Sequence, residues 1–315
     1  GGSWATLSYD LPDTPVTGLA VQDRDLVIST HGRSFWVLDD IETLRQVRAD
    51  VAKADAHIFA PADAIRRSVP AVLDYYVSGS DREVRLDVLD GEGELVRTLF
   101  QGTRDEGTYR ETWNLRYPGA VTFEGIVLEG GNPAIGPWSP IGRYEARLTV
   151  DGDVQVAAFN LKRDPRLTGV TDADLIAQFN LALAIRDAES KANGNVLLIR
   201  DVRTQVQASV MQSNDQELRE LAEQFMGDIS ELETELYQVR NQSPKDKIAF
   251  PIRLNDRLTG LRNRLERGDA APTAAYRRVY AELSAELAET MQALEVLFTE
   301  DLSRLNTELN SAGLP

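Results

Sequence analysis

The chain contains two histidines, His31 and His57, the side-chain type most often used for proton transfer and metal binding near neutral pH. They lie far apart in the sequence, and neither belongs to a carboxylate-containing motif with metal-ligand spacing. His31 shares a short polar run with Arg33, and we expect both side chains to fix a turn and bond the backbone or a neighbouring sheet. The alternative interpretation places them on a substrate-facing rim.

Carboxylates are the other groups that could do chemistry, and each cluster also has a structural interpretation. Asp39-Asp40 could bind a cation but is more typical of a cap for the next element. The runs 90–93 and 151–153 lack the ligand spacing of a calcium loop, so we predict hairpin turns. Five glutamates alternate with an apolar stripe and should be solvated: Glu231, Glu233, Glu235, Glu286 and Glu289. A ferritin-like di-metal site would need Glu-x-x-His, and residues 166–315 contain no histidine.

We therefore predict no catalytic residue, no metal site and no cofactor within this chain. The net charge of −16 argues against non-specific binding to nucleic acid or to anionic membranes. The absence of cysteine excludes disulfides, a thiolate nucleophile and a zinc–thiolate site. No apolar run approaches the length needed to span a bilayer. A length of 315 residues favours two or three domains.

Residues 1–47 carry the strand pattern that must position His31 and Arg33. Leu26–His31 alternates, a Gly-Arg pair breaks the run, and Phe35–Leu38 resumes it, which predicts two antiparallel strands and a tight turn. Val16–Val21 predicts a third strand. Three such strands make most of one β-propeller blade, which cannot bury its own faces. Phe35 and Trp36 are therefore candidate interaction residues, together with His31 and Arg33.

The next region changes from a connector to a predicted β-sandwich. Residues 48–72 form the connector, in which 57–59 either supplies an outer strand of the blade or ties down the following domain. Residues 73–165 predict an immunoglobulin-like sandwich from six alternating stretches: 73–77, 84–89, 95–100, 109–115, 144–150 and 154–161. An apolar insert at 118–140 holds Trp138, the fifth candidate interaction residue, and is expected to form an interdomain contact.

From residue 166 the periodicity changes to that of helices. Thr171 is a predicted N-cap, followed by two aspartates that complement the helix dipole. The apolar stripes predict four helices, at 172–212, 214–241, 252–267 and from 272 to about 309. Gly194 could kink the first helix. The predicted fold class is therefore multidomain α+β, ending in a four-helix antiparallel bundle at 166–315.

The residues of the first region resemble a known family. Leu11-Pro12, Thr14–Val16, Asp25–Val27, Thr30–Arg33 and Trp36–Asp40 resemble the closing blade of secreted bacterial sialidase/sortilin-like propeller proteins of the BNR (Asp-box) repeat type, often called glycosyl hydrolase-like. Residues 1–4 resemble the second half of an Asp-box hairpin. The resemblance implies that this chain is the C-terminal part of a longer exported protein, secreted, periplasmic or on the cell surface.

Two function classes follow from the resemblance. The first is a non-catalytic structural or protein-interaction region that closes the propeller and docks it to partners. Those partners would be upstream blades or a separate chain carrying them, with a protein or glycan as a further ligand. The alternative is the C-terminal fragment of a sialidase- or glucanase-like glycoside hydrolase. A glycosidase needs two carboxyls facing one sugar, and these would lie mainly in blades outside this chain.

Overall fold

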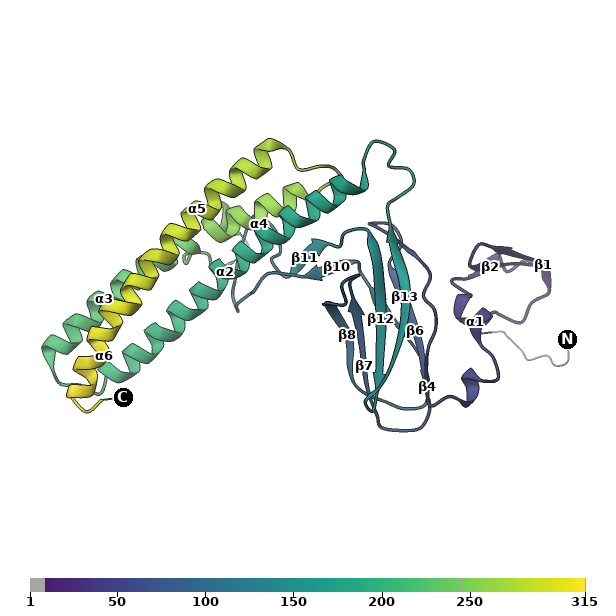
Figure 1. Ribbon diagram of the computed structural model, residues 1–315, viewed down its shortest axis with the longest axis horizontal. Coiled ribbons are helices and arrows are strands. Elements are labelled where there is room, and N and C mark those ends of the chain that lie inside the picture. The colour runs from purple at the N-terminus through teal and green to yellow at the C-terminus, as the bar shows by residue number, and fades with distance from the viewer. Residues whose placement is uncertain (1–8, 244, 315) are drawn as a thin grey trace. The chain divides into compact units, whose positions relative to one another are not determined.

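The computed structural model describes residues 9–243 and 245–314 and shows a mixed α+β protein (Figure 1). Its strands lie before residue 163, and its long helices begin at residue 172. The described residues form two compact units. The β-unit contains those among residues 1–65, 69–114 and 142–162. The helical unit contains those among residues 66–68, 115–141 and 163–315. The Asp-box resemblance at residues 1–4 lies outside the described residues.

The β-unit begins with a small antiparallel sheet in the order β1-β2-β3. Its strands are β1 (Val16–Gln22), β2 (Asp25–Thr30) and β3 (Phe35–Leu38). Asp23 and Gly32 adopt positive φ in the two connecting turns, a conformation that Gly adopts freely and Asp tolerates. The three predicted strands and the turn at Gly32-Arg33 are confirmed.

The connector joins this sheet to the rest of the β-unit. Helix α1 (Glu42–Gln46) precedes it, and the connector itself holds a 3₁₀ turn (Val51–Lys53), β4 (Ala56–Ile58) and β5 (Ala64–Ile65). His57 lies in β4, so the predicted short strand is confirmed with slightly different ends. β4 pairs with the following β-region and not with β1–β3, which decides between the two alternatives for this strand. The connector therefore ties the next region down.

Two further sheets complete the β-unit. The first has the order β5-β13-β12-β7-β8 and the second the order β4-β6-β9. The strands not yet given are β6 (Ala71–Val77), β7 (Arg82–Leu89), β8 (Leu95–Arg104), β9 (Gly107–Trp113), β12 (Gly142–Val150) and β13 (Asp153–Lys162). The ring of the fully buried Trp113 in β9 lies 5.0 Å from that of Tyr144 and 6.2 Å from that of Phe159, so the two sheets share one core.

The predicted hairpin turns of this region are confirmed. Asp90 accepts hydrogen bonds from the backbone N–H groups of Glu92 and Glu94, which closes the turn between β7 and β8. Asp151 and Gly152 both adopt positive φ between β12 and β13, as a two-residue hairpin turn requires. The Asp151 carboxylate also accepts from the Glu83 N–H at 2.8 Å. These acidic groups therefore serve as turn and backbone acceptors.

The helical unit contains five α-helices and a β-ribbon within the part of the chain that is described. The elements are β10 (Arg116–Pro118), β11 (Ile135–Trp138), α2 (Asp172–Val210), α3 (Gln216–Leu236), a 3₁₀ turn (Asp246–Ile248), α4 (Leu254–Leu265), α5 (Ala274–Val296), a π-helical turn (Leu297–Asp301) and α6 (Leu302–Ser311). Thr171 caps α2 in a full capping box with Asp174. α2 runs unbroken through Gly194.

Three helix predictions need correction. The second helix ends at Leu236 and not at 241, and Val239 is 40% exposed instead of extending the apolar stripe. The fourth predicted helix is interrupted by the π-helical turn. The extra residue of this turn changes the direction in which the following side chains point, and Leu305 and Leu309 of α6 are buried. Of the glutamates expected in solvent, Glu233 is buried, because Arg200 and Arg203 pair with it at 2.6 and 3.0 Å.

The insert 118–140 was assigned by sequence to the sandwich region, but it packs within the helical unit. Phe123 is 8% exposed and belongs to the core formed by α2–α6, and its ring meets that of Tyr237 edge-on at 5.0 Å. Asp256 of α4 accepts from the N–H groups of Glu129 and Gly130 at 2.9 and 2.6 Å. The apolar content of the insert is thus satisfied by helices that come later in the chain, so the boundary predicted at 165 differs from the structural division.

Candidate functional site

The β1–β3 sheet holds four of the five predicted interaction residues, and its register assigns each strand residue to a face. Leu19, Ile28 and Trp36 are paired across the three strands, and the next row on the same side is Val21, Leu26 and Leu38. We call this the tryptophan face. The opposite side, the phenylalanine face, consists of Gly18, Ala20, Val27, Ser29, Phe35 and Val37.

Both faces are rich in apolar side chains, yet none of the residues in these three fully described strands is buried. Phe35 is 74% exposed, Leu19 66% and Val21 56%. An antiparallel sheet that packs on one side normally alternates apolar and polar residues. β12 in the same unit does so, with Tyr144, Ala146 and Leu148 buried between partly exposed polar residues. The β1–β3 sheet instead carries exposed apolar side chains on both faces, so both faces would be stabilised by packing against other protein.

Trp36 is the largest side chain of the tryptophan face and is held in place by the adjacent turn. Its indole Nε1–H donates to the Arg33 carbonyl at 2.9 Å. It also borders a hollow of about 270 Å³, lined by Leu26, Ile28 and Leu38 and, across from them, by residues 9–11. The chain therefore presents a pre-oriented indole beside a shallow apolar depression.

His31 and Arg33 lie in the turn between β2 and β3, and it is their backbone groups that form hydrogen bonds there. The His31 N–H donates to the Pro15 carbonyl at 3.0 Å, and the His31 carbonyl accepts from the Thr14 hydroxyl at 3.3 Å. Both side chains are exposed. The backbone of the turn is thus used in bonding, while the imidazole and guanidinium are available at one end of the sheet.

Both edges of the sheet are open within the described part of the chain. β1 and β3 each pair with β2 alone, so their outer N–H and C=O groups have no ladder partner in a sheet. Such an edge can accept a further strand. The site therefore combines two apolar faces with two edges able to form backbone hydrogen bonds, which is the chemistry of β-sheet association.

The segment that follows β3, which includes α1 and leads into the connector, bonds this sheet to the remainder of the β-unit. The Asp25 carboxylate accepts from the Asp40 N–H at 3.0 Å, and the Ile41 N–H donates to the Arg24 carbonyl at 2.7 Å. Asp40 thus lies next to a strand end, as a capping residue would. Further along, Gln46 exchanges two hydrogen bonds with the backbone of Ala60, at 2.8 and 3.0 Å. The anchoring is polar and leaves the apolar faces uncovered.

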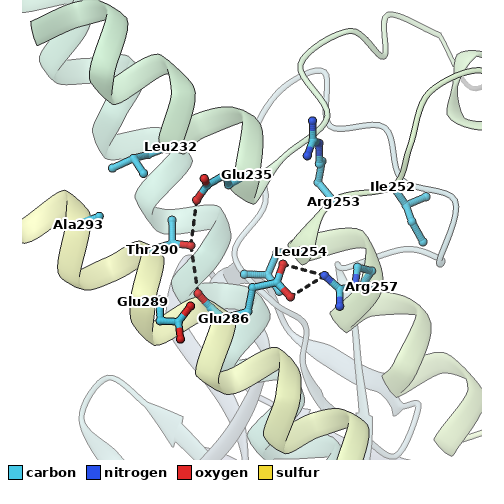
Figure 2. A pocket seen from close by; sticks show the side chains of 10 residues that line it. All are labelled: Leu232, Glu235, Ile252, Arg253, Leu254, Arg257, Glu286, Glu289, Thr290 and Ala293. Atoms are coloured by element: carbon cyan, nitrogen blue, oxygen red, sulfur yellow. Dashed lines mark hydrogen bonds and ion pairs between the residues drawn. The ribbon is translucent and has the colours of Figure 1, made fainter.

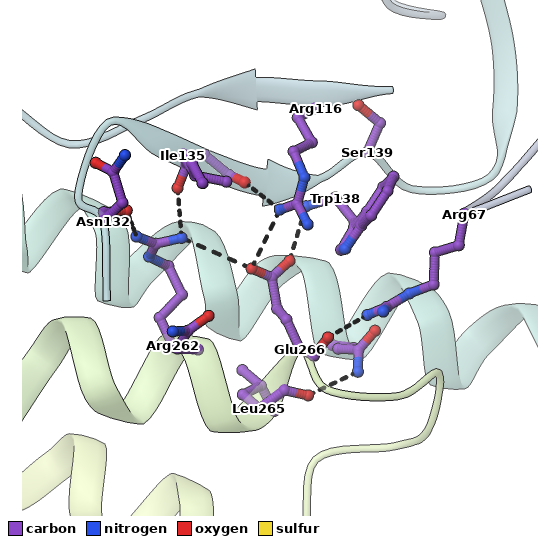
Figure 3. Close-up of polar contacts among 12 residues, drawn as sticks. Arg67, Arg116, Asn132, Ile135, Trp138, Ser139, Arg262, Leu265 and Glu266 are labelled. Atoms are coloured by element: carbon purple, nitrogen blue, oxygen red, sulfur yellow. Dashed lines mark hydrogen bonds and ion pairs between the residues drawn. The ribbon is translucent and has the colours of Figure 1, made fainter. Parts of the chain in front are cut away.

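Trp138, the fifth predicted interaction residue, belongs to the helical unit and has a different role (Figure 3). Its indole ring lies against the guanidinium of Arg116 at 3.8 Å and that of Arg67 at 5.1 Å. The backbone N–H of Trp138 donates to the Glu266 carboxylate at 2.7 Å. Burial lowers the pKa of both arginines. Trp138 is therefore part of a packed cation–π cluster that joins β11 to α4.

The same cluster contains charged residues that sequence patterns did not reveal. Arg262 is 3% exposed and lies 3.4 Å from the fully buried Glu189 and 3.7 Å from Glu266. It also donates to the Ile135 carbonyl at 2.6 Å. Burial raises the pKa of Glu189, although the nearby Arg262 and Thr259 oppose that shift. These charges join the insert to the helices and serve as its polar support.

The described residues bear on two further kinds of site, clusters of metal-ligating side chains and membrane-crossing helices. Within residues 9–243 and 245–314, no group of three or more His, Cys, Asp or Glu side chains is placed to hold a metal ion. Over the same residues, no helix combines the length and apolar character that a membrane crossing requires.

Comparisons with known proteins give no family assignment. No family model matches the chain, and no curated protein matches it significantly. Four solved chains match. One of them, named "pT26-6p", is 14% identical over 76% of this chain and has a TM-score of 0.20. This chain spans 49% of that chain. A likeness at this TM-score supports no conclusion about fold or function.

Proposed function

We propose that the β1–β3 sheet is part of a β-propeller blade, and that this chain is a non-catalytic structural and interaction region of an exported propeller protein. The remaining blades would come from upstream sequence or from a separate chain. In the same proposal, the other two sheets of the β-unit form an immunoglobulin-like sandwich. The observation that carries the proposal is a sheet with apolar residues on both faces and no buried residue.

A propeller blade accounts for this pattern better than a surface sheet does. A blade is packed between two neighbouring blades, so both of its faces need apolar side chains. Blades typically have four strands, and this sheet has three with both edges open. A three-stranded sheet left wet on both faces lacks the packed hydrophobic face that independent stability requires. Residues 11–40 resemble the closing blade of such proteins, as described from the sequence.

The first experiment measures whether the sheet is uncovered in the purified chain. We expect rapid hydrogen exchange of β1 and β3 amides, and binding of the dye anilinonaphthalene sulfonate. Replacing Leu19 and Trp36 by serine should abolish most of the dye signal. The matched control replaces Val154 and Val156, which are 57% and 50% exposed on β13 of the same unit, and should retain the signal. Protected β1 and β3 amides without dye binding would contradict the proposal.

The second experiment tests the propeller itself. The reading frame upstream of residue 1 should encode repeated four-stranded units with Ser-x-Asp hairpins. Co-expressing that segment with this chain should give a complex in which the β1–β3 amides become protected. Serine at Phe35 and Trp36 should disrupt the complex while the helical unit keeps its circular dichroism. The blade proposal would be refuted if the upstream reading frame encoded no β-repeats. It would also be refuted if the complex formed equally well with the substituted chain.

A further inference from the structure

The helical unit contains a basic segment that stands out in an acidic chain. Residues 240–278 hold ten Lys or Arg and four Asp or Glu, a net charge of +6, whereas the whole chain carries −16. Helix α4 lies in the middle of this segment. A local excess of positive charge in an otherwise negative protein creates a potential that attracts anionic groups to that place alone.

Part of this charge lines a hollow of about 490 Å³ beside α4 and α5. Arg257, Arg264 and Arg267 contribute its basic side chains, and Asn263 contributes an amide. Arg264 and Arg267 are exposed, and within the described part of the chain neither side chain forms an ion pair. Their guanidinium groups are therefore free to bind carboxylates in the bidentate manner for which arginine is suited.

The carboxylates near this hollow do little to neutralise it. Asp256 is 3% exposed and is already used, since both of its oxygens accept from the backbone of residues 129 and 130. Glu286 pairs with Arg257 (Figure 2). Arg264 and Arg267 have no acidic partner among the described residues. Glu129 is the remaining acidic residue of the lining, and it is exposed.

The rest of the lining is aliphatic and favours a peptide over other anions. Ile252 and Val279 are 44% and 36% exposed, above the buried Leu261 and Leu283. No aromatic residue is among the described residues that line the hollow. Single-stranded nucleic acids are normally held by stacking of bases on aromatic rings, which this surface lacks. Acidic side chains alternating with aliphatic ones would match both the arginines and the apolar floor.

The geometry points to this hollow as a docking groove for an acidic, aliphatic peptide segment of a partner protein. Carboxylates of the segment pair with Arg264 and Arg267, and its apolar side chains cover Val279 and Ile252. The neighbouring hollow beyond Arg257 contains Glu235 and Glu289, which repel further carboxylates and limit the acidic stretch to the α4 side (Figure 2). This surface is independent of the β1–β3 sheet and of the propeller proposed above.

The test measures binding of a fluorescent peptide of alternating Glu and Leu to the purified chain by anisotropy. We expect the double substitution R264Q/R267Q to weaken binding by about tenfold or more, since two charge-assisted contacts are lost. The matched control is R277Q/R304Q, which removes the same charge from exposed positions outside the lining and should change affinity by less than about twofold. Raising the salt concentration should weaken binding further.

Three outcomes would overturn the inference. The first is equal binding of a peptide with Gln in place of Glu, and the second is an equal loss in the R277Q/R304Q control. The third is preferential binding of heparin or of a single-stranded oligonucleotide, each measured by competition against the peptide. Circular dichroism of the variants checks that the helices are intact. A failed β1–β3 experiment would leave this result unchanged, because the substituted residues lie in different units.

Discussion

The β1–β3 sheet and the helical unit differ in how far they bury their apolar side chains. In the helical unit, the stripe residues predicted for the third helix, Leu254, Leu258, Leu261 and Leu265, are all buried. In the sheet, Leu19, Val21 and Phe35 remain more than half exposed. One region finds its cover within the described chain, and the other does not. The apolar pattern therefore predicts which residues need a partner, and only the fold shows whether the chain supplies it.

The two regions also differ in how they use charge. The helical unit buries Glu189, Glu233, Arg262 and Glu266 in ion pairs. The sheet keeps its charged turn residue Arg33 in solvent. Burying a charge is costly unless it is paired, so such groups persist only where the surrounding packing holds both partners. The comparison predicts that replacing a buried charged residue will strongly destabilise the helical unit, and that replacing a charged residue of the β1–β3 sheet will have little effect on the stability of that sheet.

The largest effect is expected for Arg262→Ala. This change leaves the buried Glu189 without its cation and removes the hydrogen bond to Ile135. It also takes one of two arginines from Glu266, which Arg116 still approaches at 3.8 Å. Breaking a buried ion pair from one side typically costs about 3–5 kcal/mol of unfolding free energy. Urea denaturation followed by far-UV circular dichroism measures the loss.

The control for that experiment is Arg304→Ala, which removes an exposed arginine of α6. We expect it to change the unfolding free energy by no more than about 0.5 kcal/mol. Adding Glu189→Gln to Arg262→Ala should recover part of the loss, because the buried charge left without a cation is removed. A cost for Arg262→Ala as small as that of the control would show that the buried cluster does not support the helical unit.

An intermediate, pH-dependent effect is expected for Asp87→Asn in the β-unit. Burial raises the pKa of this carboxyl, but hydrogen bonds from Thr98, Arg85 and Arg147 outweigh burial and hold the pKa below its usual value. Hydrogen bonds to a charged group contribute about 1.5–3 kcal/mol, so the substitution should destabilise the β-unit by that order near neutral pH.

The sign of the pH dependence follows from the lowered pKa. A carboxyl with a lower pKa in the folded state stabilises the protein above its unfolded pKa and loses this effect as pH falls through the folded value. The difference between Asp87→Asn and the original chain should therefore shrink from about pH 6 to about pH 3. Urea midpoints at the two pH values measure it. A difference that stays constant would mean that Asp87 acts through shape and not through charge.

Sequence reasoning succeeded where the signal was local. The Thr171 N-cap, the Asp151-Gly152 turn and the strands of the small sheet depend on neighbours a few residues away. It failed where the partner was distant. Phe123 packs against Tyr237, and Glu189 pairs with Arg262, contacts that no local period encodes. The apolar content of the insert was the available clue, and it identified a packed loop without identifying what it packs against.

Gly130 and Gly260 carried a further clue that sequence alone could not interpret. A Cβ added at Gly130 would lie 2.5 Å from the Gly260 backbone N and from the Asp256 carbonyl oxygen. The insert can approach the backbone of α4 this closely because Gly130 has no side chain. A glycine in a loop usually indicates a turn, so its role as a contact surface becomes visible only in the fold.

The smallest effect on stability is expected for Trp36→Ala, and it tests the comparison most directly. Trp36 is 37% exposed and makes one hydrogen bond, to the Arg33 carbonyl. Its loss should cost at most about 1 kcal/mol in the purified chain. The same replacement at the fully buried Trp113 should cost about 3–5 kcal/mol. If Trp36→Ala proved as costly as Trp113→Ala, the indole would have to be covered within this chain, and the sheet would need no partner.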